Sequence, residues 1–294
     1  MDKKRLFKPL FKSNGTVAEK IIYAVAFVIL VLISALLIYP YIFAINSSLK
    51  MDDPDFLMHM SELSWPPRFS TYVEAFTDLT VGSTTYMGMF GNSVWYAAGR
   101  AIANVGSSML LAYGVACYRF KLRNFIYNLV LFVLVMPMFG TLPATYRLYS
   151  DLGMIDSPLL LIAYAGAFDG QFLILYSFFK NLSWDYAESA FLDGAGHFTV
   201  FFKIMIPMAL PATMTMAVTN FIAAWNDYSS ILLYLPEMPT LTTGLYSFDV
   251  KQMYAADRPV YYAGLVISIL PIFALFLGMQ NTILAKTYSG GLKE

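Results

Sequence analysis

The sequence has only one cysteine and two histidines, and these low counts exclude several kinds of site. Cys117 alone cannot form a disulfide within the chain, and we interpret it as a small apolar residue. His59 and His197 fall in two different loops. The topology derived below places these loops on opposite sides of a membrane, so the two histidines cannot bind one metal ion together. We therefore predict no metal site and no cofactor bound by this chain.

Charged residues are also scarce. They make up 13% of the 294 residues, against 58% hydrophobic residues and a mean hydropathy of +0.59. This composition is far from that of a soluble domain of the same length and predicts an integral membrane protein. The net charge is 0, so no overall electric field favours nucleic acid as a partner.

A phosphate-binding loop of the type G-x-x-x-x-G-K-[ST] is missing from the sequence. A P-loop ATPase needs this loop to hold the nucleotide phosphates. If ATP drives this protein, ATP and its magnesium ion are therefore hydrolysed by a partner subunit.

Six apolar blocks are each long enough to cross a hydrocarbon core that takes about 20 residues. They lie at residues 21–43 and at about 91–118, 124–146, 158–179, 206–234 and 260–284. The first block is too long for a signal peptide and has no evident cleavage site, so we expect it to be retained. The pattern predicts an all-α membrane protein with six transmembrane helices.

The basic residues between these blocks predict the topology. Thirteen fall on one side and five on the other, and the richer side is expected to be cytoplasmic. The richer side has Lys3, Lys4, Arg5, Lys8, Lys12, Lys20, Arg119, Lys121, Arg123, Lys180, Lys203, Lys286 and Lys293; the other has Lys50, Arg68, Arg147, Lys251 and Arg258. Both termini are then cytoplasmic. The chain divides into a cytoplasmic segment 1–20, a first span 21–43, an external loop 44–90, a five-helix core 91–284 and a cytoplasmic tail 285–294.

The external loop is polar and acidic. It begins near Asn46 and includes a Trp65-Pro66-Pro67 sequence that predicts a turn. The following residues, 69–76, predict a short amphipathic helix near the membrane surface.

The longest stretch between spans on the predicted cytoplasmic side is residues 181–205. Ser183 is a plausible N-cap there, and Asp185 and Glu188 put negative charge in the first turns of a helix, where the macrodipole favours it. Gly194 interrupts the pattern. We predict two short helices joined by a bend.

Small side chains gather at this bend, so the backbone of another protein could approach it closely. Tyr186, Phe191 and Phe198 offer aromatic anchors around it. The alternative is an amphipathic helix lying in the membrane interface, which would need neither the small residues at this spacing nor the two prolines that follow.

The stretch resembles the cytoplasmic EAA loop of the membrane subunits of binding-protein-dependent ABC importers. Glu188-Ser189-Ala190 differs from Glu-Ala-Ala by one small residue, while Asp193-Gly194-Ala195, Ile204, Pro207 and Pro211 match the family pattern. The resemblance implies a type I ABC importer permease fold in a bacterial-type cytoplasmic membrane. It assigns contact with an ATPase subunit to Ala187, Glu188, Ser189, Ala190, Asp193, Gly194, Ala195 and Pro207.

The same resemblance implies the partners. Such importers combine two membrane subunits with two cytoplasmic ATPase subunits and an external solute-binding protein. Two features are similar to the carbohydrate branch, of which the maltose-type permeases are examples: the Trp225-Asn226-Asp227-Tyr228 segment and the Gly-Gly-X-Lys ending at residues 290–293. The expected substrate is a carbohydrate, with an oligosaccharide favoured.

Three ionisable residues fall within predicted spans: Arg100, Asp169 and Asp227. Each costs roughly 2.5–3.5 kcal/mol at the centre of an inserted helix, so each should face a cavity or a partner. At about 1.5 Å per residue, Arg100 and Asp227 reach similar depths from the outer side. They are expected either to form a structural ion pair or to contact the substrate directly.

Two further sequence motifs are expected to lie within transmembrane spans. Trp225, Asn226, Asp227 and Tyr228 would place an aromatic face, an amide and a carboxylate within one helical turn, as sugar recognition requires. Gly166 and Gly170 form a G-x-x-x-G motif that favours close helix packing, with Asp169 lining any remaining gap.

Other function classes remain open at this point. A self-sufficient secondary transporter would usually show internal repeats and paired breaks in its helices, and neither is evident. A membrane protease with a Ser-His dyad is excluded because neither histidine falls in a span. A membrane enzyme with a carboxylate pair in its spans would need Asp169 and Asp227 to lie at one depth. A self-sufficient secondary transporter and an ABC importer permease for a solute other than sugar remain as alternatives.

Overall fold

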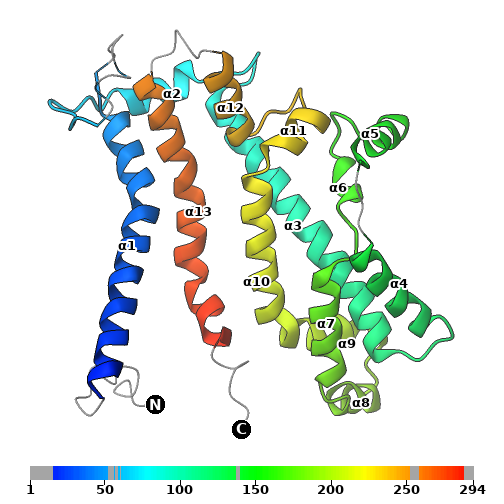
Figure 1. Ribbon diagram of the computed structural model, residues 1–294. Helices are drawn as coiled ribbons and strands as arrows, with labels where there is room; N and C mark the ends of the chain where they lie inside the picture. The colour runs from blue at the N-terminus through cyan, green and yellow to red at the C-terminus, as the bar shows by residue number, and fades with distance from the viewer. Residues whose placement is uncertain are drawn as a thin grey trace.

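The structure is a computed structural model that describes residues 16–51, 56, 59, 61–136, 140–251 and 258–287. In these ranges all the regular structure is helical, apart from one isolated β-bridge between Val81 and Thr84. Most of the basic N-terminal segment and the Gly-Gly-X-Lys ending lie outside the described residues, so their predictions are untested. Figure 1 shows long helices side by side, with short helices gathered at both ends.

Among the described residues, three helical stretches are long and apolar enough to cross a membrane: Val17–Ser48, His197–Trp225 and Arg258–Gln280. The first is α1, the second joins α9 (His197–Val200), a π-helix (Phe201–Met205) and α10 (Ile206–Trp225), and the third lies in α13 (Arg258–Thr287). α1 begins four residues before the predicted span, because Thr16 and Glu19 form a capping box.

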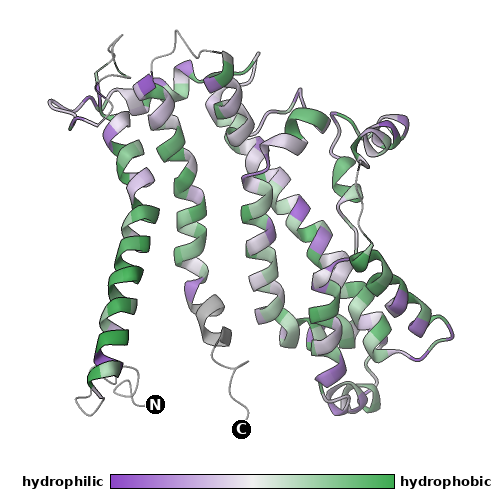
Figure 2. Cartoon of the chain, in the orientation of Figure 1, coloured by the Kyte–Doolittle hydropathy of each residue, from purple (hydrophilic) through white to green (hydrophobic). Residues whose placement is uncertain are grey.

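Helix α1 packs mainly against α13, and apolar side chains cover its remaining surface. Its buried residues, Ala44, Ser47 and Ser48, all lie in its last turns. Figure 2 shows apolar colour along most of α1, as expected of a helix surrounded by lipid.

Helix α3 (Tyr86–Cys117) runs through the centre of the fold and packs against α10 and α7. Its 32 residues measure about 48 Å, which is long enough to cross the membrane. It is less apolar than the three stretches above, and Figure 2 shows hydrophilic positions in its middle. Since α3 is largely enclosed by protein, its polar side chains can meet other helices in place of lipid.

Two of the predicted spans are not continuous helices. The block 124–146 contains α4 (Arg123–Val135) and the first part of α5 (Leu142–Asp151), and the block 158–179 contains α6 (Leu160–Ala163) and most of α7 (Gly170–Asn181). The 13 residues of α4 measure only about 20 Å, short of a core of about 30 Å. A single helix over either block was therefore a wrong prediction, and the number of crossings remains a prediction.

The block 206–234 is also divided, because α10 ends at Trp225 and α11 (Tyr228–Tyr234) starts a new helix. Asp227 caps α11 by accepting a hydrogen bond from the Ser230 amide at 3.0 Å. The predicted placement of Trp225, Asn226, Asp227 and Tyr228 within one helical turn is therefore wrong. Trp225 ends one helix, Tyr228 begins the next, and Asn226 and Asp227 form the break between them.

The close-packing interpretation of Gly166 and Gly170 is wrong as well. Gly166 lies in the non-helical segment between α6 and α7, and a Cβ atom at either glycine would meet open space. Close approaches occur at other glycines, among them Gly99, where a Cβ would collide with the Leu161 side chain of α6.

Short helices lie at both ends of the molecule. At one end are α2 (Thr71–Asp78), α5, α11 and α12 (Leu241–Lys251). At the other end are α8 (Asp185–Leu192) and α9, together with the start of the long helix α1 and the end of the long helix α13 (Figure 1). We call these the α2 end and the elbow end. Helix α2 confirms the short helix predicted near residues 69–76.

Candidate functional sites

The first candidate site is an ion pair at the break between α10 and α11. The Arg100 guanidinium on α3 donates to the Asp227 carboxylate at 2.5 Å and to the Tyr96 hydroxyl at 3.1 Å. The two charged side chains are 26% and 15% exposed, so most of each is out of contact with solvent or lipid. The structure thus brings together the two charges that the sequence placed at matching depths.

Two tyrosines that the sequence analysis missed complete this cluster. The Tyr96 hydroxyl donates to the Tyr164 hydroxyl at 2.9 Å. The Arg100 guanidinium lies 4.3 Å from the centre of the Tyr164 ring, within range of a cation–π interaction. Tyr164 reaches this place because it closes α6, at the start of the break before α7.

Asp169 lies in the same break and has different partners. It caps α7, accepting hydrogen bonds from the backbone amides of Gln171 at 3.0 Å and Phe172 at 3.1 Å. It also accepts from Asn104 and Ser108 on α3, each at 3.2 Å. Asp169 therefore stabilises the broken helix and joins it to α3.

Several polar residues of α3 form a stripe that winds gradually around the helix, because a four-residue step exceeds one turn of 3.6 residues. They recur at every fourth position as Asn92, Tyr96, Arg100, Asn104 and Ser108. Over these 16 residues the stripe extends about 24 Å, and it holds the breaks in the neighbouring segments. The sequence carried this signal in the four-residue spacing, which the analysis of single ionisable residues overlooked.

The structure separates the members of the Trp225-Asn226-Asp227-Tyr228 segment. Trp225 is 2% exposed and packs between Phe90 and Phe221, so its ring is not available to stack on a sugar. Asn226 is exposed, and Tyr228 is 44% exposed with its ring stacked on Tyr246 at 4.7 Å. Of the predicted sugar-binding motif, Asn226 and Tyr228 are therefore accessible, whereas Trp225 is not.

The second candidate site is the elbow, which we define as residues 185–200. Helices α8 and α9 are joined by a bend at Gly194, whose φ of +82° is readily adopted only by glycine. Trp184, not Ser183, occupies the N-cap position, although the Ser183 hydroxyl accepts a hydrogen bond from the Asp185 amide at 3.3 Å. The two short helices and their bend are as predicted.

The elbow presents acidic and apolar groups to its surroundings. Glu188 and Asp193 are exposed, and neither forms an ion pair with any residue that the structure describes. Leu192 is 85% and Phe198 is 82% exposed. Ala187 is fully buried beneath them, so α8 rests closely on the helices behind it.

One of the predicted anchors faces inward. Phe191 packs against His197 with ring centres 4.9 Å apart, and His197 Nδ1 lies 2.9 Å from the Tyr118 hydroxyl at the end of α3. This contact ties the elbow to the central helix and was not foreseen. Tyr186 is 53% exposed, so it keeps its predicted outward position together with Phe198.

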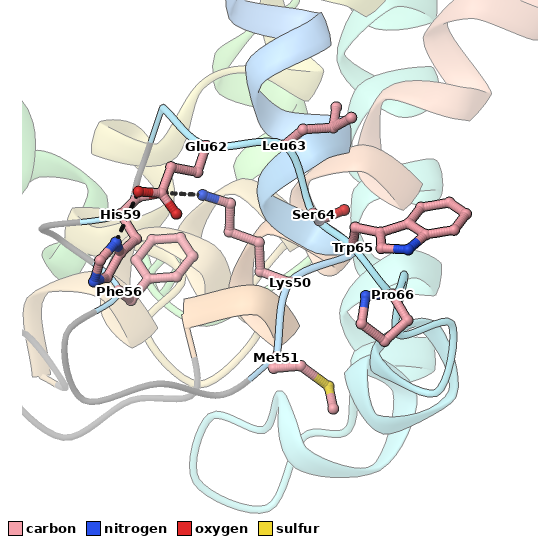
Figure 3. A pocket seen from close by; sticks show the side chains of 9 residues that line it. All are labelled: Lys50, Met51, Phe56, His59, Glu62, Leu63, Ser64, Trp65 and Pro66. Atoms are coloured by element: carbon pink, nitrogen blue, oxygen red, sulfur yellow. Dashed lines mark hydrogen bonds and ion pairs between the residues drawn. The ribbon is translucent and has the colours of Figure 1, made fainter.

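A cavity of about 280 Å³ lies at the α2 end (Figure 3). The Lys50 amine donates to the His59 carbonyl there, and burial lowers the pKa of Lys50. His59 Nδ1 lies 3.0 Å from the Glu62 carboxylate. We assign no ligand to this cavity. Among the described residues no group of three potential metal ligands occurs.

Residues 104–287 match the family model of the binding-protein-dependent transport system inner membrane component. The chain belongs to this family. It is accordingly a permease subunit of an ABC transporter, a multi-pass protein of the inner membrane, and not the subunit that catalyses ATP hydrolysis. The matched region contains the elbow, Asp169 and Asp227, whereas Arg100 lies just before it.

Curated relatives agree with this membership. The chain is 29% identical over 273 residues to the diacetylchitobiose uptake system permease protein NgcG of Streptomyces coelicolor, covering 91% of this chain and 88% of the relative. It is 31% identical over 261 residues to the probable ABC transporter permease protein YurM of Bacillus subtilis, covering 87% and 83%. It is 26% identical over 272 residues to the galactooligosaccharides transport system permease protein GanQ of Bacillus subtilis, covering 91% and 94%.

A solved structure supports the fold. The chain superimposes with a TM-score of 0.73 on a chain of a bacterial ABC transporter involved in the import of the acidic polysaccharide alginate. The identity is 20%, and the match covers 91% of this chain and 98% of the other. The all-helical permease fold is thereby established.

Proposed function

We propose that this chain is one of two permease subunits of an ATP-driven importer, and that it forms part of the pathway for an oligosaccharide. The observation that carries the proposal is the elbow, which exposes three carboxylates and three large hydrophobic side chains between membrane helices: Asp185, Glu188, Asp193, Tyr186, Leu192 and Phe198. The names of the relatives, which include diacetylchitobiose and galactooligosaccharide systems, favour a carbohydrate as the solute.

The elbow is proposed to dock into an ATPase subunit that binds ATP and magnesium. Glu188 and Asp193 would meet basic groups, while Leu192 and Phe198 would fill an apolar socket. Small side chains in this stretch would let the ATPase subunit approach closely; they are Ala187, Ser189, Ala190 and Ala195. Pro207 follows the π-helix that leads into α10.

Arg100 and Asn104, the partly exposed members near the middle of the stripe on α3, are proposed to face the pathway. Their guanidinium and amide groups match the hydrogen-bonding needs of a sugar. Asn226 in the break before α11 and Tyr228 at the start of α11 are accessible, and Arg100, Asp169 and Asp227 would hold the pathway in shape. Trp225 would pack behind these residues and help to fix their positions.

The remaining proposals concern topology and partners. The elbow end is proposed to be cytoplasmic, with both termini there, because the start of α1, the α3–α4 loop, the end of α7 and α9 lie toward that end (Figure 1). The α2 end would then meet an extracellular solute-binding protein. The chain is proposed to pair with a different second permease subunit.

A deletion strain tests this proposal. Cells that lack this chain are expected to lose uptake of one oligosaccharide from a labelled panel, and the wild-type gene should restore it. Uptake of an amino acid and of a short peptide serves as the control. Loss of one of these, with all oligosaccharide uptake intact, would support a non-sugar permease and overturn the carbohydrate assignment.

A further inference from the structure

A second cavity lies at the elbow end, where α3 ends, α4 begins and α7 ends. It has a volume of about 470 Å³. Three basic side chains line it: Arg119, Arg123 and Lys180. Arg119 and Arg123 precede Lys180 by more than 50 positions in the sequence, yet all three side chains line the same cavity.

The charge in this cavity is not neutralised by its walls. No carboxylate is among the lining residues, and none of the three basic side chains forms an ion pair within the described part of the chain. Arg123 donates to the Ala116 carbonyl at 3.3 Å, and Lys180 lies 5.5 Å from the Tyr176 ring centre. The amino end of α4 adds a partial positive charge.

The surroundings place the cavity where lipid headgroups lie. Next to it, α4 carries apolar side chains that face outward, with Phe125 63% and Phe132 61% exposed. The cavity wall combines the basic groups with Phe179, Leu182 and Trp184. A tryptophan beside apolar and basic residues at the end of a spanning helix is typical of the membrane interface.

We propose that this cavity binds the phosphate headgroup of an anionic phospholipid in the leaflet at the elbow end. A phosphate diester fits the arginine pair through charge-assisted hydrogen bonds, and acyl chains can follow the exposed face of α4. Because Trp184 immediately precedes α8, the bound lipid would lie directly beside the elbow. An acidic side chain of a partner subunit would satisfy the charges equally well, but it would leave the apolar face of α4 uncovered.

The test is native mass spectrometry of the purified transporter complex with phosphatidylglycerol and with phosphatidylcholine of the same chain length. We expect selective retention of phosphatidylglycerol. The Arg119→Gln/Arg123→Gln variant should weaken that retention at least about tenfold, and Lys180→Gln by about threefold, because each removes a phosphate contact. Arg119→Lys/Arg123→Lys should keep most of it.

Lys121→Gln is the matched control, because Lys121 lies between the two arginines in the sequence but does not line the cavity. Equal loss in this control, or equal retention of both lipids, would overturn the proposal. So would displacement of the lipid by an equal concentration of glycerol 3-phosphate, since a free anion would then suffice. Loss of an ATPase subunit from the glutamine variants with lipid retention unchanged would assign these cations to a protein partner instead.

Discussion

The charged residues at the α10–α11 break and those at the elbow are arranged in opposite ways. Arg100 and Asp227 face each other inside the fold, and each is also held by groups of this chain. Glu188 and Asp193 point outward from the elbow and have no ion-pair partner in the described residues. In the first region the charged groups have partners within the chain, and in the second region they remain available to a binding partner.

The apolar residues show the same contrast. Near the break, Trp225 and Tyr96 are almost completely buried, whereas Leu192 and Phe198 at the elbow are more than four-fifths exposed. Exposed large apolar groups on a surface with unpaired charges are typical of a protein interface. We infer that the first region is completed by folding and the second by association with a partner.

Reversing the charge at the elbow should have the largest effect. Glu188→Lys replaces a carboxylate that we propose meets a basic group of the ATPase subunit, so like charges would then be opposed. We expect uptake to fall at least about a hundredfold, since like-charge contact at an interface costs several kcal/mol, while membrane insertion stays normal. Labelled uptake, normalised to membrane abundance, is the measurement.

Asp185→Asn is the control for that variant. Asp185 lies on the same helix and accepts a hydrogen bond from the Ser183 hydroxyl. Its neutralisation should change uptake only about twofold. Normal uptake by Glu188→Lys would contradict the proposed role of this carboxylate.

The internal ion pair predicts a different pattern. Arg100→Gln and Asp227→Asn each leave one charge without its partner, and because both side chains are partly exposed we expect about 1–3 kcal/mol of destabilisation for each. The double variant should recover part of this loss. A double-mutant cycle on thermal stability and uptake isolates the pairwise contribution. Strictly additive losses would show that the two residues act separately.

The bend at Gly194 should be sensitive to its backbone conformation. Gly194→Val forces a β-branched residue to a φ of +82°, which costs about 1–2 kcal/mol and displaces α8 relative to α9. We expect the yield of copurified ATPase subunit to fall severalfold. Gly196→Ala is the control, since Gly196 has a φ of −78°. A wild-type yield from the valine variant would exclude a role for the bend in docking.

The smallest effect concerns the partly buried pair Arg68–Glu74 at the α2 end. The hydrogen bond from Arg68 lowers the pKa of Glu74 below its ordinary value of 4.5. The pair therefore stabilises the fold above pH 4.5 and loses this contribution as the pH falls through the lowered pKa. Glu74→Gln should cost at most about 1 kcal/mol at pH 7.

That difference should be smaller at about pH 3 than at pH 7, because the wild-type carboxyl takes up a proton as the pH falls through its lowered pKa. Thermal unfolding of the purified protein at both pH values measures it. A constant difference across this range would mean that Glu74 stabilises the fold by packing and not by charge.

The sequence predicted the elbow well because its signals are local. Two acidic residues in a first turn, a glycine at the bend and small residues beside it specify short helices without reference to the rest of the chain. The Arg100–Asp227 contact was also within reach, because the depth of a charge in a span follows from its position along the helix.

The broken helices could not be predicted in the same way. The segment before α7 is apolar enough to continue a helix, and it ends because Asp169 caps α7 while Asn104 and Ser108 of α3 hold the carboxylate. These contacts join residues about 60 positions apart, so hydropathy does not contain them. The burial of Trp225 likewise depends on Phe90 of another helix.

Copurification of the ATPase subunit tests the contrast between the two regions most directly. Affinity-purified complexes should be compared for the wild type, Glu188→Lys and Arg100→Gln at equal membrane abundance. We expect the elbow variant to lose the ATPase subunit and the Arg100 variant to retain it while uptake falls. Retention of the ATPase subunit by Glu188→Lys, or its loss from Arg100→Gln, would contradict the division into a region completed by folding and a region completed by a partner.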